Sequence, residues 1–237
     1  MTSLVIFIPR TEASFALLRN LLPTIIRRFR KVALPLPREY CTAAIMDPNQ
    51  ALNILSKLGG SFVRLWGWFP KFFRDLIAGG VDAYFHCYDD MNRLRNAVNV
   101  GIEIARLVLR YRLGAATNIN DWLIPFKKSA LVNINIKDIG RYDVVIVDDY
   151  SLMLSSLNDL GSIITLGPLV PTPIDLLALI SIGRLSEDNL SRVVSYVTKY
   201  IGDYVIMSRD LTEAFSRLVS DSDYLSFVRS LGLLVVL

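Results

Sequence analysis

The sequence contains a single histidine, His86, in the stretch GGVDAYFHCYDDM, which ends with the acidic pair Asp89 and Asp90. An imidazole with an ordinary pKa of about 6.5 suits proton transfer near neutral pH. We therefore predict His86 as a general acid or base, with a packed strand histidine as the alternative. Asp89 and Asp90 are predicted either to cap the following helix or to contact a ligand or metal.

A second acidic pair, Asp148 and Asp149, ends the apolar stretch DVVIVDD. Adjacent residues on an extended strand point to opposite sides, so at most one of the two carboxylates faces a shared site. We predict Asp148 as a catalytic base and Asp149 as a ligand contact, with a helix cap or solvated turn as the alternative. The ordinary aspartate pKa of about 3.9 has to be raised for this role, by burial or by a neighbouring carboxylate.

Arg10, Thr11 and Ser14 follow the apolar run SLVIFI and open a helical pattern. Backbone N–H groups at a helix N-terminus attract anions, so these three side chains are candidates for binding a carboxylate or phosphate. Local capping of the helix, with Thr11 as the N-cap, is the alternative.

Apolar runs and helical patterns alternate along the chain. Strands are predicted at residues 3–8, 31–37, 61–69, 81–87, 130–136, 143–149 and 175–183. Helices are predicted after Thr11, Asp47 and Pro70, over Met91 to Gly114, and after Ser186, Ser208 and Asp221 or Ser222. The alternation predicts an α/β protein with mainly parallel sheets flanked by helices. Ligands of such sheets bind beyond the carboxyl ends of the strands, where both acidic pairs are placed.

The hydrophobic content and the charge of the chain indicate which partners it binds. The chain has 237 residues, 52% of them hydrophobic, and a net charge of +4. Its densest basic run is Arg27, Arg28, Arg30 and Lys31 at the end of a predicted helix, where cations suit the helix dipole. A nucleic-acid patch is the alternative, and we predict no nucleic-acid partner. The hydrophobic richness suggests a homo-oligomer.

No segment is predicted to span a membrane, because the apolar stretch from Ile163 to Ile182 is interrupted by three prolines and Asp175. The apolar run at the start is shorter than that of a signal peptide, so we predict a cytoplasmic protein.

Cys41 and Cys87 are predicted to form neither a disulfide framework nor a zinc site. We predict no bound metal and no cofactor, with an Asp-based magnesium site as the alternative. The aromatic cluster from Phe62 to Phe73 is predicted to pack in the core, with a partner surface or a ligand stack as alternatives.

The segment from Tyr142 to Val197 resembles a known family. It contains Asp159-Leu160-Gly161, then Pro171 and Pro173, the apolar run from Leu176 to Ile182, Arg184 and a helical pattern. This order is similar to chorismate dehydratase and dihydroxynaphthoate synthase of the menaquinone pathway. The stretch PKFFRDLIAGGVDAYFH looks like the first lobe of type II periplasmic-binding-protein-like folds, the fold of those enzymes.

The resemblance implies a two-lobed α/β fold, with residues 1–90 plus 170–237 as one lobe and 91–169 as the other. It implies a cofactor-free lyase that binds a small carboxylated ring compound between the lobes, with Thr172 as a further ligand contact. Where the family has a catalytic histidine followed by glutamate, this chain has Asp148 and Asp149. A non-catalytic binder of a small anion is therefore the alternative.

The start of the chain resembles a different enzyme. LVIFIPRTEASFALLRNLL, followed by a predicted strand and a proline-rich loop, is similar to uroporphyrinogen-III synthase. That enzyme is also two-lobed, α/β and of similar length, so a tetrapyrrole-forming synthase is a third interpretation.

Overall fold

The computed structural model describes residues 4–128, 139, 141–156 and 162–237, which form two compact units. Unit 1 takes in the described residues up to Arg95 and those from 139 to Leu166. Unit 2 takes in residues 96–128 and 167–237. The predicted lobes divide the chain differently, because they group residues 170–237 with residues 1–90.

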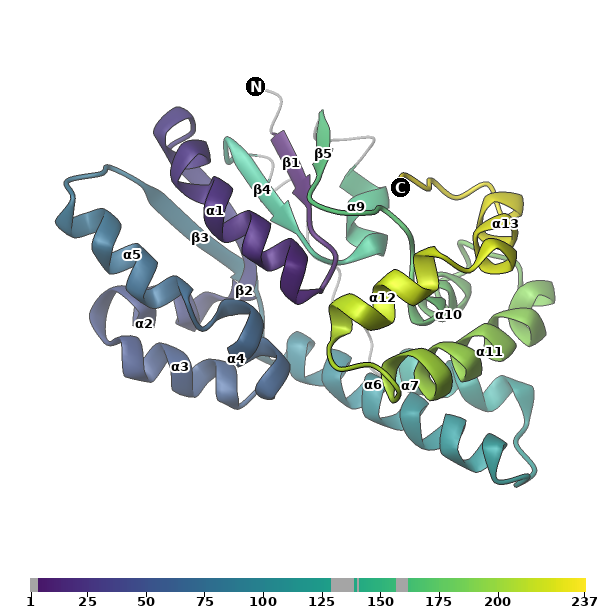
Figure 1. Ribbon diagram of the computed structural model, residues 1–237. Coiled ribbons are helices and arrows are strands. Elements are labelled where there is room, and N and C mark those ends of the chain that lie inside the picture. The colour runs from purple at the N-terminus through teal and green to yellow at the C-terminus, as the bar shows by residue number, and fades with distance from the viewer. Residues whose placement is uncertain (1–3, 129–138, 140, 157–161) are drawn as a thin grey trace. The chain divides into compact units, whose positions relative to one another are not determined.

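Unit 1 contains a parallel sheet of five strands in the order β3-β2-β4-β1-β5 (Figure 1). The strands are β1 (Leu4–Phe7), β2 (Lys31–Pro37), β3 (Tyr84–Asp89), β4 (Val144–Val147) and β5 (Ile163–Thr165). This confirms the predicted α/β class with a parallel sheet. The strand β4, which the prediction places in the other lobe, lies between β2 and β1 and pairs with both.

The central position of β4 follows from its side chains. All four of its residues, Val-Val-Ile-Val, are buried. A strand of a parallel sheet is covered on both faces, and β-branched side chains fit that pleated, dry environment. The flanking strand β1 is buried in the same way from Val5 to Phe7.

Helices cover both faces of this sheet. They are α1 (Glu12–Arg28), α2 (Arg38–Met46), α3 (Pro48–Ser56), α4 (Gly60–Trp66), α5 (Phe69–Ala78) and α9 (Tyr150–Ser156). Side chains of α1 to α5 share one core cluster with Ile6, Leu34 and Ile146 of the sheet. On the opposite face, the ring of Tyr150 in α9 meets that of Phe7 at 6.4 Å.

The strand predicted over residues 61–69 is wrong, because this segment forms α4 and the start of α5. Leu65 and Trp66 of α4 and Phe69 and Phe73 of α5 are all buried, and the four-residue spacing of Phe69 and Phe73 places them on one side of α5. Their rings form the predicted aromatic core: Phe73 meets Phe85 of β3 at 4.8 Å.

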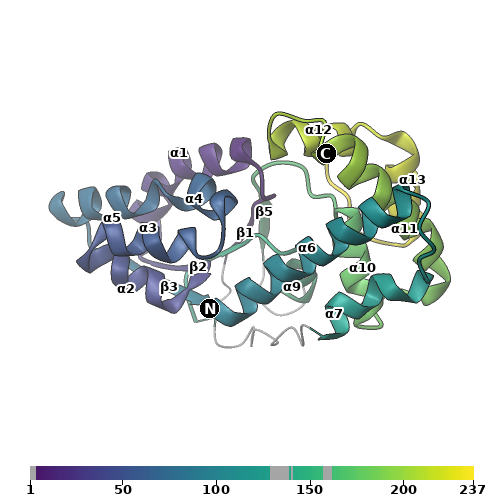
Figure 2. The same cartoon turned by 90° about the horizontal axis from the view of Figure 1, so that it is seen from below.

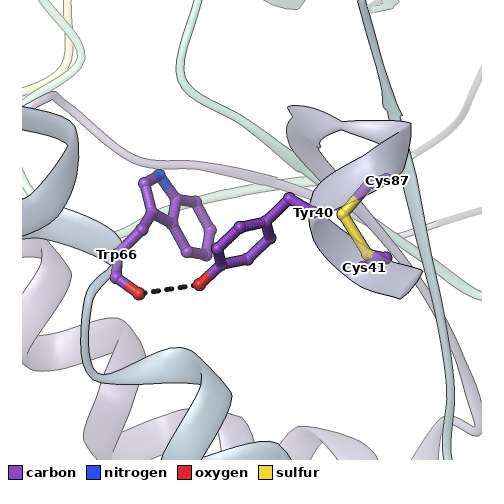
Figure 3. Close-up of a disulfide and its surroundings, with 4 residues drawn as sticks. All are labelled: Tyr40, Cys41, Trp66 and Cys87. Carbon is purple, nitrogen blue, oxygen red and sulfur yellow. Dashed lines mark hydrogen bonds between the residues drawn. A yellow bond between two sulfur atoms is a disulfide. The ribbon is translucent and has the colours of Figure 1, made fainter. Parts of the chain in front are cut away.

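Cys41 of α2 and Cys87 of β3 form a disulfide (Figure 3). The expectation that the two cysteines play no disulfide role is therefore wrong. Their positions, 46 residues apart in sequence, gave no local signal of pairing, and the fold brings their Cα atoms to 5.7 Å. Next to this bond, the Tyr40 hydroxyl donates a hydrogen bond to the Trp66 carbonyl oxygen at 3.0 Å. The disulfide thus joins the helical layer of unit 1 to the edge strand of its sheet.

Unit 2 consists mainly of helices (Figure 2). They are the larger part of α6 (Met91–Arg112), then η1 (Ile119–Leu123), α7 (Ile124–Lys128), α10 (Pro173–Ser181), η2 (Glu187–Asn189), α11 (Leu190–Lys199), η3 (Tyr200–Val205), α12 (Leu211–Val219) and α13 (Ser222–Ser230). The strand predicted over residues 175–183 is wrong, because the segment forms α10. Thr172 and Asp175 make a reciprocal capping box with Pro173 in the first turn, which starts a helix there. Residues 175–183 are apolar on nearly every side, so their periodicity did not distinguish a helix from a strand.

Predicted helix starts agree with the structure at Thr11, Asp47, Ser186 and Asp221, each of which accepts a capping hydrogen bond. The start after Ser208 is wrong, because Asp210 caps α12. The strand predicted at 130–136 lies outside the described residues. Within the described part of the chain, no helix is long and apolar enough to cross a membrane.

The disulfide gives a stability prediction. Replacing both cysteines with serine should lower the free energy of unfolding by about 4 kcal/mol, because the bond closes a loop of 46 positions in the unfolded chain. Urea unfolding of the oxidised wild type and the Cys41→Ser/Cys87→Ser variant measures this difference. Thiol titration of the unfolded, unreduced wild type is the control. It should find no free thiol, and finding two would contradict the pairing.

Candidate functional site

The carboxyl ends of the parallel strands in unit 1 gather charged side chains. Arg10 follows β1, Asp89 ends β3, and Asp148 follows β4. Because the strands are parallel, these ends share one edge of the sheet. The predicted candidates Arg10, Asp89, Asp148 and Asp149 are thus brought to the same edge.

Arg10 and Asp148 form a two-point ion pair across the neighbouring strands β1 and β4. The Nε of Arg10 lies 3.0 Å from Oδ2 of Asp148, and its Nη2 lies 3.2 Å from Oδ1. The Asp148 side chain is only 3% exposed, whereas that of Arg10 is 41% exposed. Burial raises the pKa of the Asp148 carboxyl, and the Arg10 guanidinium opposes that rise.

Asp89 and Arg93 form a second pair, between the end of β3 and the first turn of α6. The Nε of Arg93 donates to Oδ1 of Asp89 at 2.6 Å, and its Nη2 donates to Oδ2. Both side chains are buried, with 0% exposure for Asp89 and 9% for Arg93. The Nη1 of Arg93 also lies 3.9 Å from Oδ2 of Asp149. Arg93 therefore links the end of β3 to the end of β4.

Sequence reasoning missed Arg93. A signal was present: an arginine in the first turn of a helix sits at the positive end of the helix dipole and needs nearby anions. It follows Asp89 by four positions, and Asp149 supplies a second carboxylate from a distant part of the chain. The spacing to Asp89 could have identified the first partner, but only the fold reveals the second.

A buried tyrosine, Tyr88, lies near both pairs. The Tyr88 hydroxyl donates to the Ile146 carbonyl oxygen at 2.9 Å. Burial raises the pKa of this phenol, and the nearby carboxylates of Asp148 and Asp89 raise it further. The two pairs therefore lie within electrostatic reach of one phenol, which joins strands β3 and β4.

Helix capping accounts for part of the predicted site. The Oγ1 of Thr11 accepts from the Ser14 backbone N–H at 3.2 Å and shares a 2.9 Å hydrogen bond with the Ser14 hydroxyl. Asp90 caps α6 by accepting from the backbone N–H groups of Asn92 and Arg93. Asp149 accepts from the Leu152 N–H in the first turn of α9. The capping alternatives for Thr11, Asp90 and Asp149 are therefore correct. Ligand contacts by Arg10, Thr11, Ser14, Asp89 and Asp149 stay predictions.

Two predicted site residues take no part in these ion pairs. His86 pairs in register with Ala33 of β2 and stacks on the Tyr142 ring at 4.8 Å, before β4 begins. In the described part of unit 1, no contact joins His86 to Asp148. Burial lowers the pKa of His86, as do Arg141 and Arg38. Thr172 belongs to unit 2, where its hydroxyl caps α10 and donates to Asp175 at 2.8 Å.

We name Arg10, Asp89, Arg93, Asp148 and Asp149 the carboxyl-edge cluster. It contains three carboxylates and two guanidinium groups, and each arginine faces at least one carboxylate. Among residues that the structure describes, no group of three or more His, Cys, Asp or Glu side chains could hold a metal ion. The arrangement suits the binding of an ion-pairing ligand, because an arginine held by a buried aspartate keeps a fixed orientation.

Comparisons with models of protein families, with curated proteins and with solved structures find no match to this chain.

The pairing of Arg93 gives a second stability prediction. Arg93→Ala should lower the free energy of unfolding by about 3 kcal/mol or more, because it leaves the fully buried Asp89 carboxylate without its partner. Urea unfolding measures the change. Arg95→Ala is the matched control, since Arg95 is exposed on the same helix and should change stability by less than about 0.5 kcal/mol. Equal midpoints for the two variants would show that the buried pair contributes nothing.

Proposed function

We propose that the protein binds a small carboxylated ligand at the carboxyl edge of the sheet in unit 1, with Arg10 as the cation that receives the carboxylate. One observation carries this proposal: Arg10 is 41% exposed although a buried carboxylate holds it on two atoms. In the other pair of the cluster, both side chains are buried. Arg10 is therefore the more exposed of the two arginines in the cluster and presents its positive charge to solvent.

The ion pair with Asp148 preorganises Arg10 for binding. A guanidinium carries five N–H donors in a rigid fork, and the bond to Asp148 uses one on Nε and one on Nη2. This contact removes rotational freedom from a long side chain before a ligand arrives, so less ordering is needed on binding. The nearby start of α1, capped by Thr11, adds the positive end of a helix dipole.

A lyase-type reaction on such a ligand is the catalytic form of the proposal, and Asp148 is its base. Burial raises the pKa of Asp148, which moves a carboxylate toward the range useful for proton transfer. The ion pair with Arg10 would have to open for Asp148 to accept a proton, so ligand binding to Arg10 and activation of Asp148 are linked. The resemblance to the menaquinone-pathway enzymes supplies the substrate class, a carboxylated ring compound.

A tetrapyrrole-forming synthase is the second candidate, and specific observations favour it. The segment resembling uroporphyrinogen-III synthase forms the β1-α1-β2 unit, with Arg10 at its first turn. By contrast, the apolar strand that the menaquinone resemblance includes at residues 176–182 is the helix α10. Linear tetrapyrroles carry several carboxylates, so a cation at this turn fits them as well.

Three further features are proposed from the sequence alone. They are a two-lobed fold of the type II periplasmic-binding-protein kind, a cytoplasmic location and a homo-oligomeric state.

Thermal unfolding with a ligand panel tests the binding site. The panel is chorismate, a hydroxymethylbilane analogue and simple carboxylates. A ligand at about 100 times its dissociation constant adds roughly 2.7 kcal/mol, which raises the midpoint by a few degrees at this chain length. We expect one of these compounds to raise the midpoint of the wild type and of Arg19→Ala, an exposed arginine on α1. Arg10→Ala should lose the rise, measured against its own ligand-free midpoint. A full rise in Arg10→Ala would remove Arg10 from the site.

Turnover of the ligand that binds tests the catalytic form. Asp148→Asn keeps one oxygen that can accept from Arg10 but cannot accept a proton as a base. We expect product formation, followed by chromatography, to be lost in Asp148→Asn while the thermal shift persists. Unchanged turnover would exclude Asp148 as the base, and absence of product with the wild type would leave a non-catalytic binder.

A further inference from the structure

At the amino ends of the same strands lies a separate group of cationic side chains and aromatic rings. Lys31 begins β2 and pairs in register with Tyr84, the first residue of β3. Asp143, just before β4, accepts hydrogen bonds from the backbone N–H groups of Arg30 and Lys31 at 3.2 and 3.0 Å. The starts of three strands and the end of α1 therefore meet here. We name Arg28, Arg30, Lys31, Tyr84, Arg141 and Tyr142 the amino-edge surface.

Aromatic rings lie nearly parallel on this surface. The Tyr84 and Tyr142 rings have centroids 6.3 Å apart with 4° between their planes, and His86 stacks on Tyr142 at 4.8 Å with 9°. Tyr84 and His86 alternate along β3, so both side chains leave the strand on the same side. Tyr142 is buried between its neighbours, but Tyr84 is 57% exposed. The Tyr84 ring therefore extends the stack to solvent.

Positively charged side chains lie at the same end of the sheet. Arg28, Arg30, Lys31 and Arg141 are all exposed. The guanidinium of Arg141 lies 5.5 Å from the centre of the Tyr142 ring, and that of Arg28 lies 5.4 Å from the Phe29 ring. Among the described residues of this edge, Asp82 pairs with Arg30 at 3.2 Å and Asp143 accepts the two backbone N–H groups. The charge balance of these described residues is therefore positive.

Capping accounts for only some of these residues. Arg27 and Arg28 occupy the last turn of α1, where cations suit the dipole. Neither Lys31 nor Arg141 lies in a helix, and an exposed tyrosine on an edge strand contributes little to the core. Stackable rings beside cations on an open surface are the combination with which proteins bind single-stranded nucleic acids.

We propose that the amino-edge surface binds single-stranded nucleic acid, with a base stacked on Tyr84 and phosphates paired with Lys31 and Arg141. The cations come from the end of α1, the start of β2 and the segment before β4, so they spread along an edge as the phosphates of a strand do. This proposal replaces the expectation of no nucleic-acid partner, and it is independent of the carboxylate site at the other edge.

Fluorescence anisotropy with a labelled 12-nucleotide oligo-uridine and its DNA counterpart tests the proposal on the full chain. Tyr84→Ala should weaken binding roughly tenfold, because one stacked base is lost. Arg141→Ala should weaken it and reduce the slope of log affinity against log salt by about 0.7, the value for one phosphate on a single strand. Arg19→Ala removes the same charge from the exposed middle of α1 and should leave both quantities unchanged.

His86 supplies an independent readout, because its ring signals in a proton NMR spectrum need no assignment in a chain with one histidine. Its pKa is lowered by burial, by Arg141 and by Arg38, and the rings of Tyr142 and Tyr84 also lie nearby. A phosphate held by Arg141 offsets that positive field. An NMR pH titration should therefore show a higher His86 pKa with the oligonucleotide than without it.

The results of these experiments distinguish an oligonucleotide from a free anion as the ligand of this surface. Oligonucleotide binding that Tyr84→Ala and Arg141→Ala weaken, with Arg19→Ala unchanged, supports the proposal. No anisotropy change at low salt overturns it, as does equal weakening by all three variants, which marks non-specific charge attraction. A His86 shift with uridine monophosphate or inorganic phosphate, but none with the oligonucleotide, also overturns it and assigns the surface to a free anion.

Discussion

At the carboxyl ends of the strands, charged side chains are buried away from water. Asp89 and Asp148 are almost completely buried, and a buried carboxylate is tolerated only with a partner that matches its geometry. Arg93 and Arg10 each supply two parallel N–H groups. These pairs fix the ends of β1, β3 and β4 relative to one another. Burial raises the pKa of Asp148, and its ion pair with the partly exposed Arg10 opposes that rise.

The edge strand β3 connects the main features of unit 1. Phe85 packs its ring in the aromatic core, and Cys87 is bonded to α2. Two residues later, Asp89 holds Arg93, while Tyr84 and His86 leave the strand on the other face. The period of two residues along a strand separates these roles, with core contacts on one side and the ring stack on the other. A single short strand thus serves the core, the carboxyl-edge cluster and the amino-edge surface.

The sequence was sufficient for elements whose signals are local. Alternating apolar runs and capping residues predicted the parallel sheet, the strand β2 with its bounds, and helix starts at Thr11 and Asp47. It failed where an apolar run was uniform, as in α10, or where aromatic residues suit strands and helices alike, as in α4. The partners of Cys41, Asp148 and Asp149 come from distant parts of the chain. The order of the strands in the sheet decides which of these residues meet. The spacing of residues along the sequence does not reveal that order.

A double-mutant cycle between Asp89 and Arg93, followed by urea unfolding, tests the central claim most directly. The variants are Asp89→Leu, Arg93→Leu and the two together. If the pair satisfies two buried charges, each single change costs several kcal/mol, and the double variant costs less than the sum by roughly 2 kcal/mol or more. Additive costs, within about 0.5 kcal/mol, would show that the two charges do not depend on each other and would contradict this account of the carboxyl edge.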